Sequence, residues 1–234
     1  MTILNKRQVF KQDPSAYVQS PVRKEYYDLV YQDLERLKVN SVLDVGCASG
    51  DFFYFLDDQK IQTKVGIDIS NELINIARKR VSHAKFHEAD VFEFFKGKTE
   101  FDAVCLLGTL HTFLDYEELI GSICNSCSPR ALIIQSPFNT NPVDVHVFHA
   151  GATENSEKNQ YQCAYSIYCI EKLTSFLKTL CAVVSVKNYE MKQTLKRDYE
   201  NPMRNYHINV DGEKCLTNGA SIILREFIVT AEFN

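Results

Sequence analysis

The sequence predicts an α/β fold, a Rossmann-like doubly wound sheet that is mainly parallel, with an antiparallel closing strand and helices on both faces. Two observations support this. Short apolar runs alternate with helix-length segments from about residue 41 to residue 135, an alternation typical of parallel sheets. A glycine-bearing turn joins the first of these runs to a helix, as it does in nucleotide-binding α/β folds.

The first strand and the turn after it are the most informative part of the chain. Residues 42–45 form a short apolar run, which predicts a buried strand and places the Asp44 carboxylate at the mouth of the sheet. Gly46 and Gly50 stand in the turn, and an apolar helix follows over 51–56. Glycine lets the backbone approach a ligand closely, and free N–H groups at a helix start favour a polar or anionic group. The turn therefore predicts a nucleotide-type cofactor.

The next predicted strand, over 64–68, ends in a second acid, Asp68. In nucleoside sites such an acid accepts hydrogen bonds from ribose hydroxyls. Dinucleotide sites also place a glycine at the sixth position of the loop. Here the fifth position is glycine and the sixth is Asp51, so the spacing disfavours a nicotinamide cofactor.

The remaining elements complete the alternation. Ser70 is expected to cap a helix over 71–80, in which apolar residues recur at helical spacing. Further strands are expected over 84–89, 101–107 and 131–135, and two closing strands over 181–187 and 220–230. A helix is expected over 116–127. Two more helices have a clear apolar face: a leading helix with Tyr26, Val30, Leu34 and Leu37, and a helix over 170–180 with Leu173, Phe176, Leu177 and Leu180 inward.

One domain is expected to account for residues 1–234, because no linker rich in proline, glycine or serine divides the chain. We expect an N-terminal lid and helix over 1–38, a cofactor-binding half over 39–137, and substrate-binding segments over 138–168 and 190–218. The polar stretch in the last segment is far longer than a hairpin turn. Its aromatic and hydrogen-bonding residues favour a folded substrate arm.

Four signals stand in the order found in class I S-adenosylmethionine-dependent methyltransferases, and the chain resembles that family. They are the glycine loop with Ala48 in place of its middle glycine, the strand-end Asp68, the pair Asp90-Val91, and the run 101–111. A looser resemblance, in 138–145 and in two later short runs, is to methyltransferases encoded with bacterial surface-polysaccharide pathways.

The resemblance implies S-adenosylmethionine as cofactor and gives roles to individual residues. Asp44 and the glycine loop would lie under the methionine part, Asp68 would accept from the ribose hydroxyls, and Ile69 would pack on the adenine. Asp90 would accept from the adenine amino group. Arg23 would either pair with the cofactor carboxylate or remain a solvated arginine at a helix start. The expected cofactor-binding residues are Tyr17, Ser20, Arg23, Asp44, Gly46, Cys47, Ala48, Gly50, Asp68, Ile69, Asp90, Val91, Leu107 and Gly108.

Histidines mark the expected acceptor side. His111 follows the fourth predicted strand and is our first candidate for a catalytic base or acceptor contact, with packing on the cofactor loop as the alternative; His146 is the second candidate. An imidazole base predicts a rate that falls below about pH 6.5. The segment of His146 also reads as a surface loop or, less favoured, a metal site. The expected substrate-binding residues are Asp144, His149, Arg204, Tyr206 and His207.

Composition fits an ordinary enzyme domain. The 234 residues carry a formal net charge of −4, which argues against nonspecific nucleic-acid binding. No apolar run approaches the roughly 18 residues of a membrane span, and the start does not read as a signal peptide, so we expect a cytoplasmic protein. The eight cysteines are then expected to be reduced. Cys124 and Cys127 fall inside a predicted helix and lack a second pair, so we expect no metal.

The function expected from the sequence is a metal-independent methyltransferase acting on a small polar acceptor, with O-methylation of a sugar or nucleotide-linked intermediate favoured. A hydroxyl acceptor needs a base, whereas a carboxylate or tertiary amine does not. A nicotinamide-dependent oxidoreductase and a non-catalytic S-adenosylmethionine-binding protein are the alternatives. The oligomeric state stays open.

Overall fold

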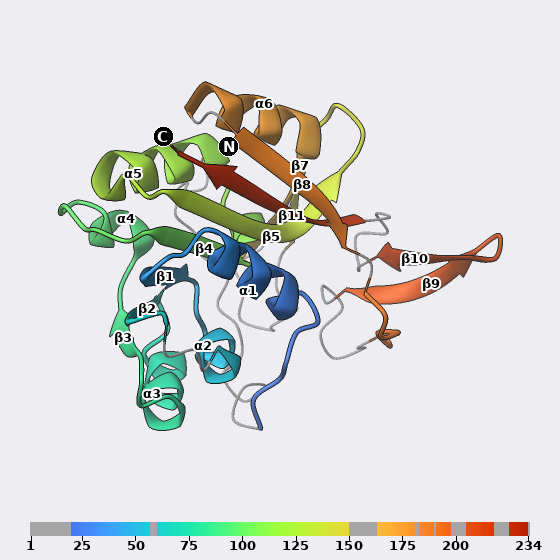
Figure 1. Cartoon of the computed structure of the whole chain (residues 1–234). Coiled ribbons are helices and arrows are strands. Elements are labelled where there is room, and N and C mark those ends of the chain that lie inside the picture. The colour runs from blue at the N-terminus through green and yellow to red at the C-terminus, as the bar shows by residue number, and fades with distance from the viewer. Residues whose placement is uncertain are drawn as a thin grey trace, which may run out of the picture.

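The structure is a computed structural model that describes residues 20–56, 60–149, 163–180, 183–189, 191–197, 205–217 and 225–233. Most described strands belong to one sheet in the order β3-β2-β1-β4-β5-β11-β8, and the hairpin β6–β7 joins it through β7 and β5 (Figure 1). The strands of this sheet are β1 (Ser41–Val45), β2 (Thr63–Asp68), β3 (Lys85–Glu88), β4 (Ala103–Leu107), β5 (Ala131–Asn139), β6 (Val145–His149), β7 (Cys163–Cys169), β8 (Val183–Tyr189) and β11 (Arg225–Glu232).

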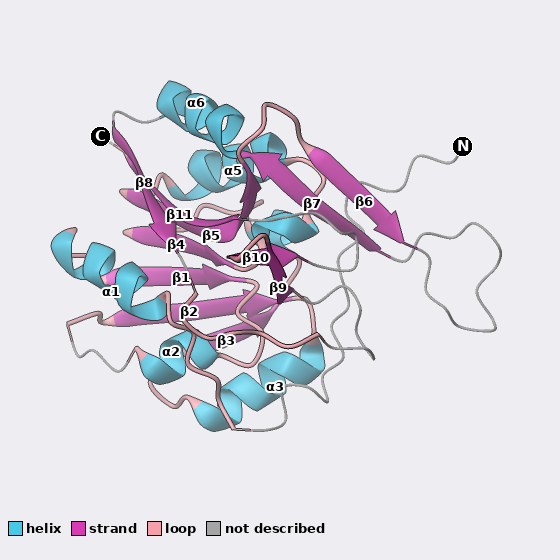
Figure 2. Cartoon of the chain, turned by 90° about the vertical axis from the view of Figure 1, so that its right-hand side faces the viewer, coloured by secondary structure: helices cyan, strands magenta, loops and turns pink. Residues whose placement is uncertain are grey.

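The first five strands run parallel, and β11 runs antiparallel between β5 and β8. Figure 2 shows helices on both sides of the sheet. This confirms the predicted mainly parallel sheet with an antiparallel closing strand. The helices are α1 (Tyr27–Arg36), α2 (Asp51–Phe55), α3 (Asn71–Arg80), α4 (Val91–Phe94), the short 3-10 helix η2 (Leu110–Thr112), α5 (Tyr116–Cys127) and α6 (Ile170–Leu180).

Each face of the sheet has its own apolar core. One contains side chains of α4, α5 and α6, and the other contains side chains of α1, α2 and α3. The predicted Ser70 cap is present, because its hydroxyl accepts from the Leu73 amide; the Asp115 carboxylate caps α5 in the same way, accepting from the Glu118 amide. Leu180 is an exception to the predicted packing of α6, since the last turn of the helix leaves its side chain 40% exposed.

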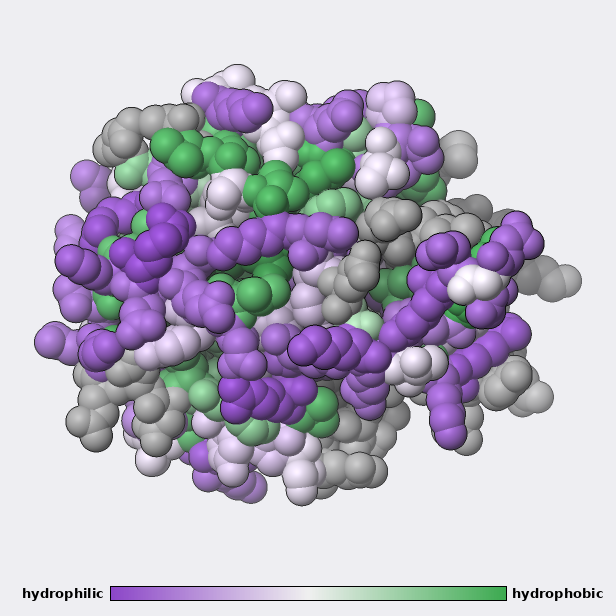
Figure 3. All heavy atoms as spheres, turned by 45° about the vertical axis from the view of Figure 1, so that its right-hand side comes forward, coloured by the Kyte–Doolittle hydropathy of each residue, from purple (hydrophilic) through white to green (hydrophobic). Residues whose placement is uncertain are grey.

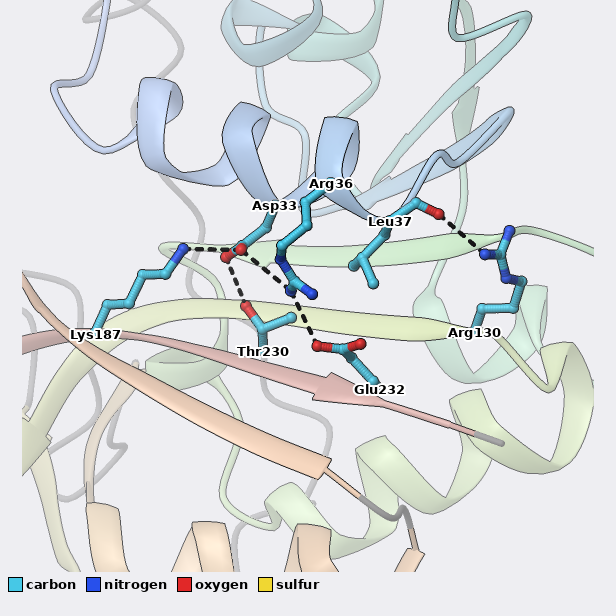
Figure 4. A network of polar contacts seen from close by, with 7 residues as sticks. All are labelled: Asp33, Arg36, Leu37, Arg130, Lys187, Thr230 and Glu232. Atoms are coloured by element: carbon cyan, nitrogen blue, oxygen red, sulfur yellow. Dashed lines mark hydrogen bonds and ion pairs between the residues drawn. The ribbon is translucent and has the colours of Figure 1, made fainter.

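Helix α1 is held to the antiparallel part of the sheet by a buried carboxylate that the sequence did not reveal. Asp33 is 2% exposed, and it accepts from Lys187 Nζ at 2.8 Å and from the Thr230 hydroxyl at 3.0 Å (Figure 4). Arg36 lies 3.4 Å from Asp33 and 3.0 Å from Glu232. These contacts satisfy a charge that would otherwise be costly to bury.

The hairpin β6–β7 corrects the expected surface loop around Asp144–His149. Its strands pair in antiparallel register from Val145 opposite Ile167 to His149 opposite Cys163. Residues 165–169 of β7 are buried on both faces of the strand, so this hairpin is packed into the domain and is not a loop. Strand β5 also continues to Asn139, beyond the predicted end at 135.

The expected substrate arm contains a second, separate hairpin. It is made by β9 (Tyr206–Val210) and β10 (Glu213–Thr217), which pair in antiparallel register. Asp211 and Gly212 form its turn with φ of 53° and 88°, the conformation in which an Asp-Gly pair closes a two-residue hairpin. Residues 206–217 of this segment are therefore folded, and a role of the segment 190–218 in substrate binding stays a prediction.

No helix among the described residues is long and apolar enough to cross a membrane. Hydrophilic side chains cover much of the face seen in Figure 3, with apolar atoms visible between them.

Replacing Asp33 with alanine should lower the free energy of unfolding by about 1.5–3 kcal/mol, the range for hydrogen bonds to a charged group. Glu35→Ala, which removes the exposed pair with Lys60 from the same helix, should cost less than about 1 kcal/mol. Urea denaturation of both variants measures the difference. Equal losses would show that the buried network adds nothing beyond an ordinary surface pair.

Candidate active site

The candidate site lies where the carboxyl ends of the parallel strands meet at one edge of the sheet. The glycine loop follows β1, Asp68 ends β2, and Asp90 follows β3. Gly108 and η2 follow β4 at the same edge. Open α/β sheets bind ligands in this position.

The glycine loop needs small residues for two separate reasons. Gly46, Ala48 and Gly50 all have positive φ, at 75°, 46° and 76°, a region that favours glycine. A Cβ at Gly46 would lie 2.4 Å from the Thr109 hydroxyl oxygen, and one at Gly50 would lie 2.9 Å from the Phe86 ring. The loop therefore packs closely against neighbouring elements, and Ala48 takes the strained conformation without being glycine.

The amide groups of this loop are not free for an anion, which corrects one expectation from the sequence. Four of them donate to acceptors within the protein, so the loop offers close backbone approach rather than a cradle of open N–H groups. The four bonds are Gly46 N and Cys47 N to Ile67 O at 2.8 and 3.0 Å, Ala48 N to Asp68 Oδ2 at 2.9 Å, and Gly50 N to Cys47 O at 2.9 Å.

Asp68 joins the loop to the end of β2. Its two carboxylate oxygens accept from the amides of Ala48 and Ser70, both at 2.9 Å. Burial raises the pKa of Asp68, and these backbone hydrogen bonds oppose the rise. Ile69, the next residue, is 42% exposed. A carboxylate beside an exposed apolar side chain fits a nucleoside, which needs an acceptor for its ribose and a flat apolar contact for its base.

Asp44 lies beneath the loop and is 3% exposed. Burial, and secondarily the nearby Asp68, raises the pKa of Asp44 to about 8. Burial likewise raises the pKa of the Cys47 thiol well above its ordinary value, so this cysteine is no nucleophile. Asp44 lies in β1 and Cys47 in the glycine loop after it, and a contact of either residue with the cofactor stays a prediction.

Asp90 caps α4, accepting from the amides of Phe92 and Glu93 at 2.9 and 3.1 Å through one carboxylate oxygen, Oδ1. Val91 begins the helix and is buried. Across the edge, Gly108 has a φ of 73°, and a Cβ there would lie 3.7 Å from Gln135 Oε1 and 3.9 Å from the Tyr26 hydroxyl. Polar groups therefore surround the end of β4.

The leading segment reaches the glycine loop, because the Val22 amide donates to Asp51 Oδ2 at 3.1 Å. Ser20 is exposed. Arg23 pairs with Asp28 and lies over the Phe55 ring at 5.8 Å, as an arginine at a helix start does. Tyr17 lies outside the described residues.

His111 stands in η2 directly after β4, as the sequence predicted. Its ring lies 4.5 Å from the Tyr165 ring, and its Nδ1 is shielded from solvent with no partner among the described residues. Burial lowers the pKa of His111 to about 4. An activity change near pH 6.5 is therefore not expected from this imidazole, which corrects the sequence-based expectation.

His146 belongs to a hydrogen-bonded cluster between β6, β7 and η2. Its Nδ1 lies 2.9 Å from the Ser166 hydroxyl, which in turn donates to the Phe113 carbonyl at 2.6 Å. Because a hydroxyl has one hydrogen, Nδ1 of His146 must be the donor to Ser166, which leaves Nε2 as the basic nitrogen. The Tyr168 hydroxyl donates to the same carbonyl at 2.6 Å.

Asp144 stabilises the fold, since its carboxylate accepts a hydrogen bond from the Cys169 amide at 2.7 Å and forms an ion pair with Lys172 at 3.0 Å. The structure does not describe the side chain of His149. Among the described residues no group of three histidine, cysteine or acidic side chains is arranged to hold a metal.

The arm touches the site through Tyr165, whose hydroxyl donates to Asn205 Oδ1 at 3.3 Å. Tyr206 lies under Arg197, with the guanidinium 5.4 Å from the ring. His207 Nδ1 accepts from the Leu195 amide at 2.9 Å, and burial lowers the pKa of His207. Arg204 lies outside the described residues. Tyr206 and His207 thus have partners within the arm.

A family model described as a methyltransferase domain matches residues 18–144. The chain belongs to this methyltransferase family. The family confirms S-adenosylmethionine as the cofactor and argues against the nicotinamide alternative. No curated protein sequence matches the chain.

Several solved structures share the fold of this methyltransferase. The N-terminal domain of EvdMO1 with SAH bound has 13% identity and a TM-score of 0.60, over 91% of this chain and 83% of that one. The same domain in the presence of SAH and D-fucose has 13% identity and a TM-score of 0.60, over 97% and 90%. Magnesium protoporphyrin IX methyltransferase from Synechocystis PCC 6803 with bound SAM has 17% identity and a TM-score of 0.51, over 90% and 79%.

Sequence reasoning missed a polar group that the methyltransferase fold brings to the same edge. Gln135 Nε2 donates to Glu226 Oε1 at 3.1 Å, and Tyr26 and Tyr189 lie beside them with ring centroids 5.9 Å apart. The available signal was Glu226, an acid placed directly before the apolar run 227–229 of the closing strand.

Asp68→Ala should weaken binding of S-adenosylhomocysteine by about 10- to 150-fold, corresponding to about 1.5–3 kcal/mol for hydrogen bonds to a charged acceptor. Glu88→Ala is the matched control, because Glu88 lies beside Asp68 at the end of β3. Titration calorimetry measures both affinities. An Asp68→Ala protein that binds as tightly as the wild type would remove Asp68 from the cofactor site.

Proposed function

We propose that this methyltransferase methylates an oxygen of a small polar acceptor, a sugar or nucleotide-linked intermediate of surface-polysaccharide biosynthesis, in the cytoplasm. The observation that carries the proposal is the arrangement of Asp68, Ile69 and the glycine loop at the edge of the sheet, with polar side chains gathered around the end of β4 beside them.

In this proposal Asp68 accepts from the ribose hydroxyls and Ile69 packs on the adenine. The Asp90 carboxylate accepts from the adenine amino group through Oδ2, the oxygen that does not cap α4. Asp44 and the backbone of residues 46–50 lie under the methionine part, and Leu107 and Gly108 form the floor near the sulfonium. The leading segment, with Tyr17, Ser20 and Arg23, covers the cofactor. Bound S-adenosylmethionine supplies an electrophilic methyl group.

The protein's own contribution is to orient the acceptor, exclude water and accept a proton. His111 is neutral near pH 7 and offers its shielded nitrogen as a hydrogen-bonding contact for the acceptor. His146 Nε2 is a second basic nitrogen on the same side. Arg204, Tyr206, His207, Asp144 and His149 remain candidates for acceptor contacts.

A sugar acceptor is supported by the polar side chains at the end of β4, which suit hydroxyl groups, and by the structural relative determined in the presence of D-fucose. Porphyrin methylation, named for another relative, is less favoured, because the described edge offers hydrogen-bonding groups rather than a broad apolar surface. A non-catalytic S-adenosylmethionine-binding protein is the remaining alternative.

Purified protein should release S-adenosylhomocysteine when it is supplied with S-adenosylmethionine and a panel of deoxyhexoses and nucleotide-linked hexoses. The release should survive exhaustive EDTA treatment, because the proposed reaction uses no metal. Binding of S-adenosylhomocysteine without turnover on any acceptor would favour the non-catalytic alternative. Turnover that disappears with EDTA and returns with one divalent ion would contradict the metal-free reaction.

His111→Ala should lower kcat/KM for the acceptor by about 10- to 100-fold, as expected when a hydrogen-bonding contact is lost. The affinity for S-adenosylhomocysteine should not change. His83→Ala is a control on the opposite part of the domain, where His83 contacts the Phe53 carbonyl. Steady-state kinetics decide this, and an unchanged kcat/KM would exclude His111 from the acceptor site.

A further inference from the structure

A buried acid at the active edge has no role in the cofactor site. Glu226 lies on β11 and is 9% exposed. Because β11 runs antiparallel to β5, its first residues lie beside the last residues of β5, with Glu226 opposite Pro137. On the other side Glu226 lies opposite Tyr189 of β8. A residue near the start of β11 is thereby placed at the carboxyl edge of the parallel strands.

Gln135 connects this acid to the end of β4. Its side-chain nitrogen donates to Glu226 Oε1 at 3.1 Å, while its side-chain oxygen lies 3.7 Å from the position of a Cβ on Gly108. Its backbone carbonyl accepts from the Gly108 amide at 2.9 Å. The Tyr26 hydroxyl lies 3.9 Å from the same Cβ position. The Gln135 side chain therefore links Glu226 to Gly108, which belongs to the proposed floor of the methyl-transfer site.

The other residues on the same face of β11 stabilise the fold. Ile228 packs into the core beneath α1, Thr230 donates to Asp33, and Glu232 pairs with Arg36. A buried carboxylate is costly without a comparable ion-pair network. The packing of the fold does not account for an acid at position 226, which is the reason to look for a chemical role.

Burial raises the pKa of Glu226 to about 7, and the hydrogen bond from Gln135 and the charge of Lys24 oppose the rise. Lys24, Tyr26 and Tyr189 are titratable groups near it; burial, and then the charges of Glu25 and Glu226, raises the pKa of Tyr189 above its usual range. A base works best when its pKa is close to the operating pH. By this criterion Glu226 is a better base than His111.

We propose that Glu226 accepts the proton of the acceptor hydroxyl, with Gln135 as its positioning residue. This inference rests on the proposed O-methyltransferase function. As the acceptor oxygen bonds to the methyl carbon, the carbon–sulfur bond breaks and its electron pair stays on sulfur. The hydroxyl proton passes to the Glu226 carboxylate and later to solvent. Glu226 must be ionised to act, so the rate should rise with pH through about 7.

The first test needs neither cofactor nor acceptor. In protein labelled with carbon-13 at glutamate carboxyl groups, one glutamate should titrate near pH 7 by NMR. That signal should be absent from Glu226→Gln and present in Glu232→Gln, which changes the same charge at the far end of β11. If no glutamate titrates above about pH 5.5 in the wild-type protein, the inference is overturned.

The second test measures rates on the sugar panel. Glu226→Gln should lower kcat by about 10²- to 10⁴-fold, while its affinity for S-adenosylhomocysteine stays within about twofold, which also shows that it is folded. Glu226→Asp should recover part of the rate, and Glu232→Gln should keep all of it. His111→Ala should keep the acidic limb of the pH profile near 7.

The outcomes separate the two proposals. A wild-type enzyme that turns over, together with a Glu226→Gln variant of equal kcat and unchanged pH profile, overturns the role of Glu226 alone. A wild-type protein that binds S-adenosylhomocysteine but methylates no hydroxyl acceptor overturns the proposed function, and the role of Glu226 with it.

Discussion

The hydrogen bond from the Ala48 amide to the Asp68 carboxylate fixes the active edge of the sheet. It joins the loop after β1 to the end of β2 at 2.9 Å. The same loop is closed from the β4 side, where Thr109 fills the space that a Cβ on Gly46 would need. The ends of three parallel strands are thus held in one arrangement. The residues proposed to bind the cofactor depend on it, because Asp68, Gly46 and Gly108 come from those three different strands.

The parallel half of the fold could be predicted because its signals are local. Strands buried on both faces appear as continuous apolar runs, and caps such as Ser70 and Asp115 lie within three residues of the amides they bind. The glycine positions of the turn could also be predicted from the sequence. At Gly46, the positive φ and the close contact with Thr109 both exclude a side chain, so the residue type itself indicates the conformation. The loop amides were not predictable in the same way. Three of the four amides donate to acceptors on β2, which are the Ile67 carbonyl and the Asp68 carboxylate.

The remaining features depend on contacts between distant parts of the chain. Asp33 reads as a surface residue of α1 until Lys187 and Thr230, more than 150 positions later, are brought beside it. The segment 146–149 was interpreted as a surface loop or as a site of chemistry, whereas its residues belong to a strand that pairs with β7. The low pKa of His111 arises from burial against Tyr165, which belongs to that same unpredicted hairpin.

The direction of the closing strand decides which residues reach the active edge. A strand parallel to β5 would bring its carboxyl end there, and Glu232 rather than Glu226 would lie near Gln135. Because β11 is antiparallel, Glu226 lies at the active edge, while Glu232 and Thr230 lie toward the opposite edge, where they hold α1 through Arg36 and Asp33. One strand therefore serves both purposes. Its end anchors the helix whose first turn follows Tyr26, and its start supplies the carboxylate that lies with Tyr26 around Gln135 and Gly108.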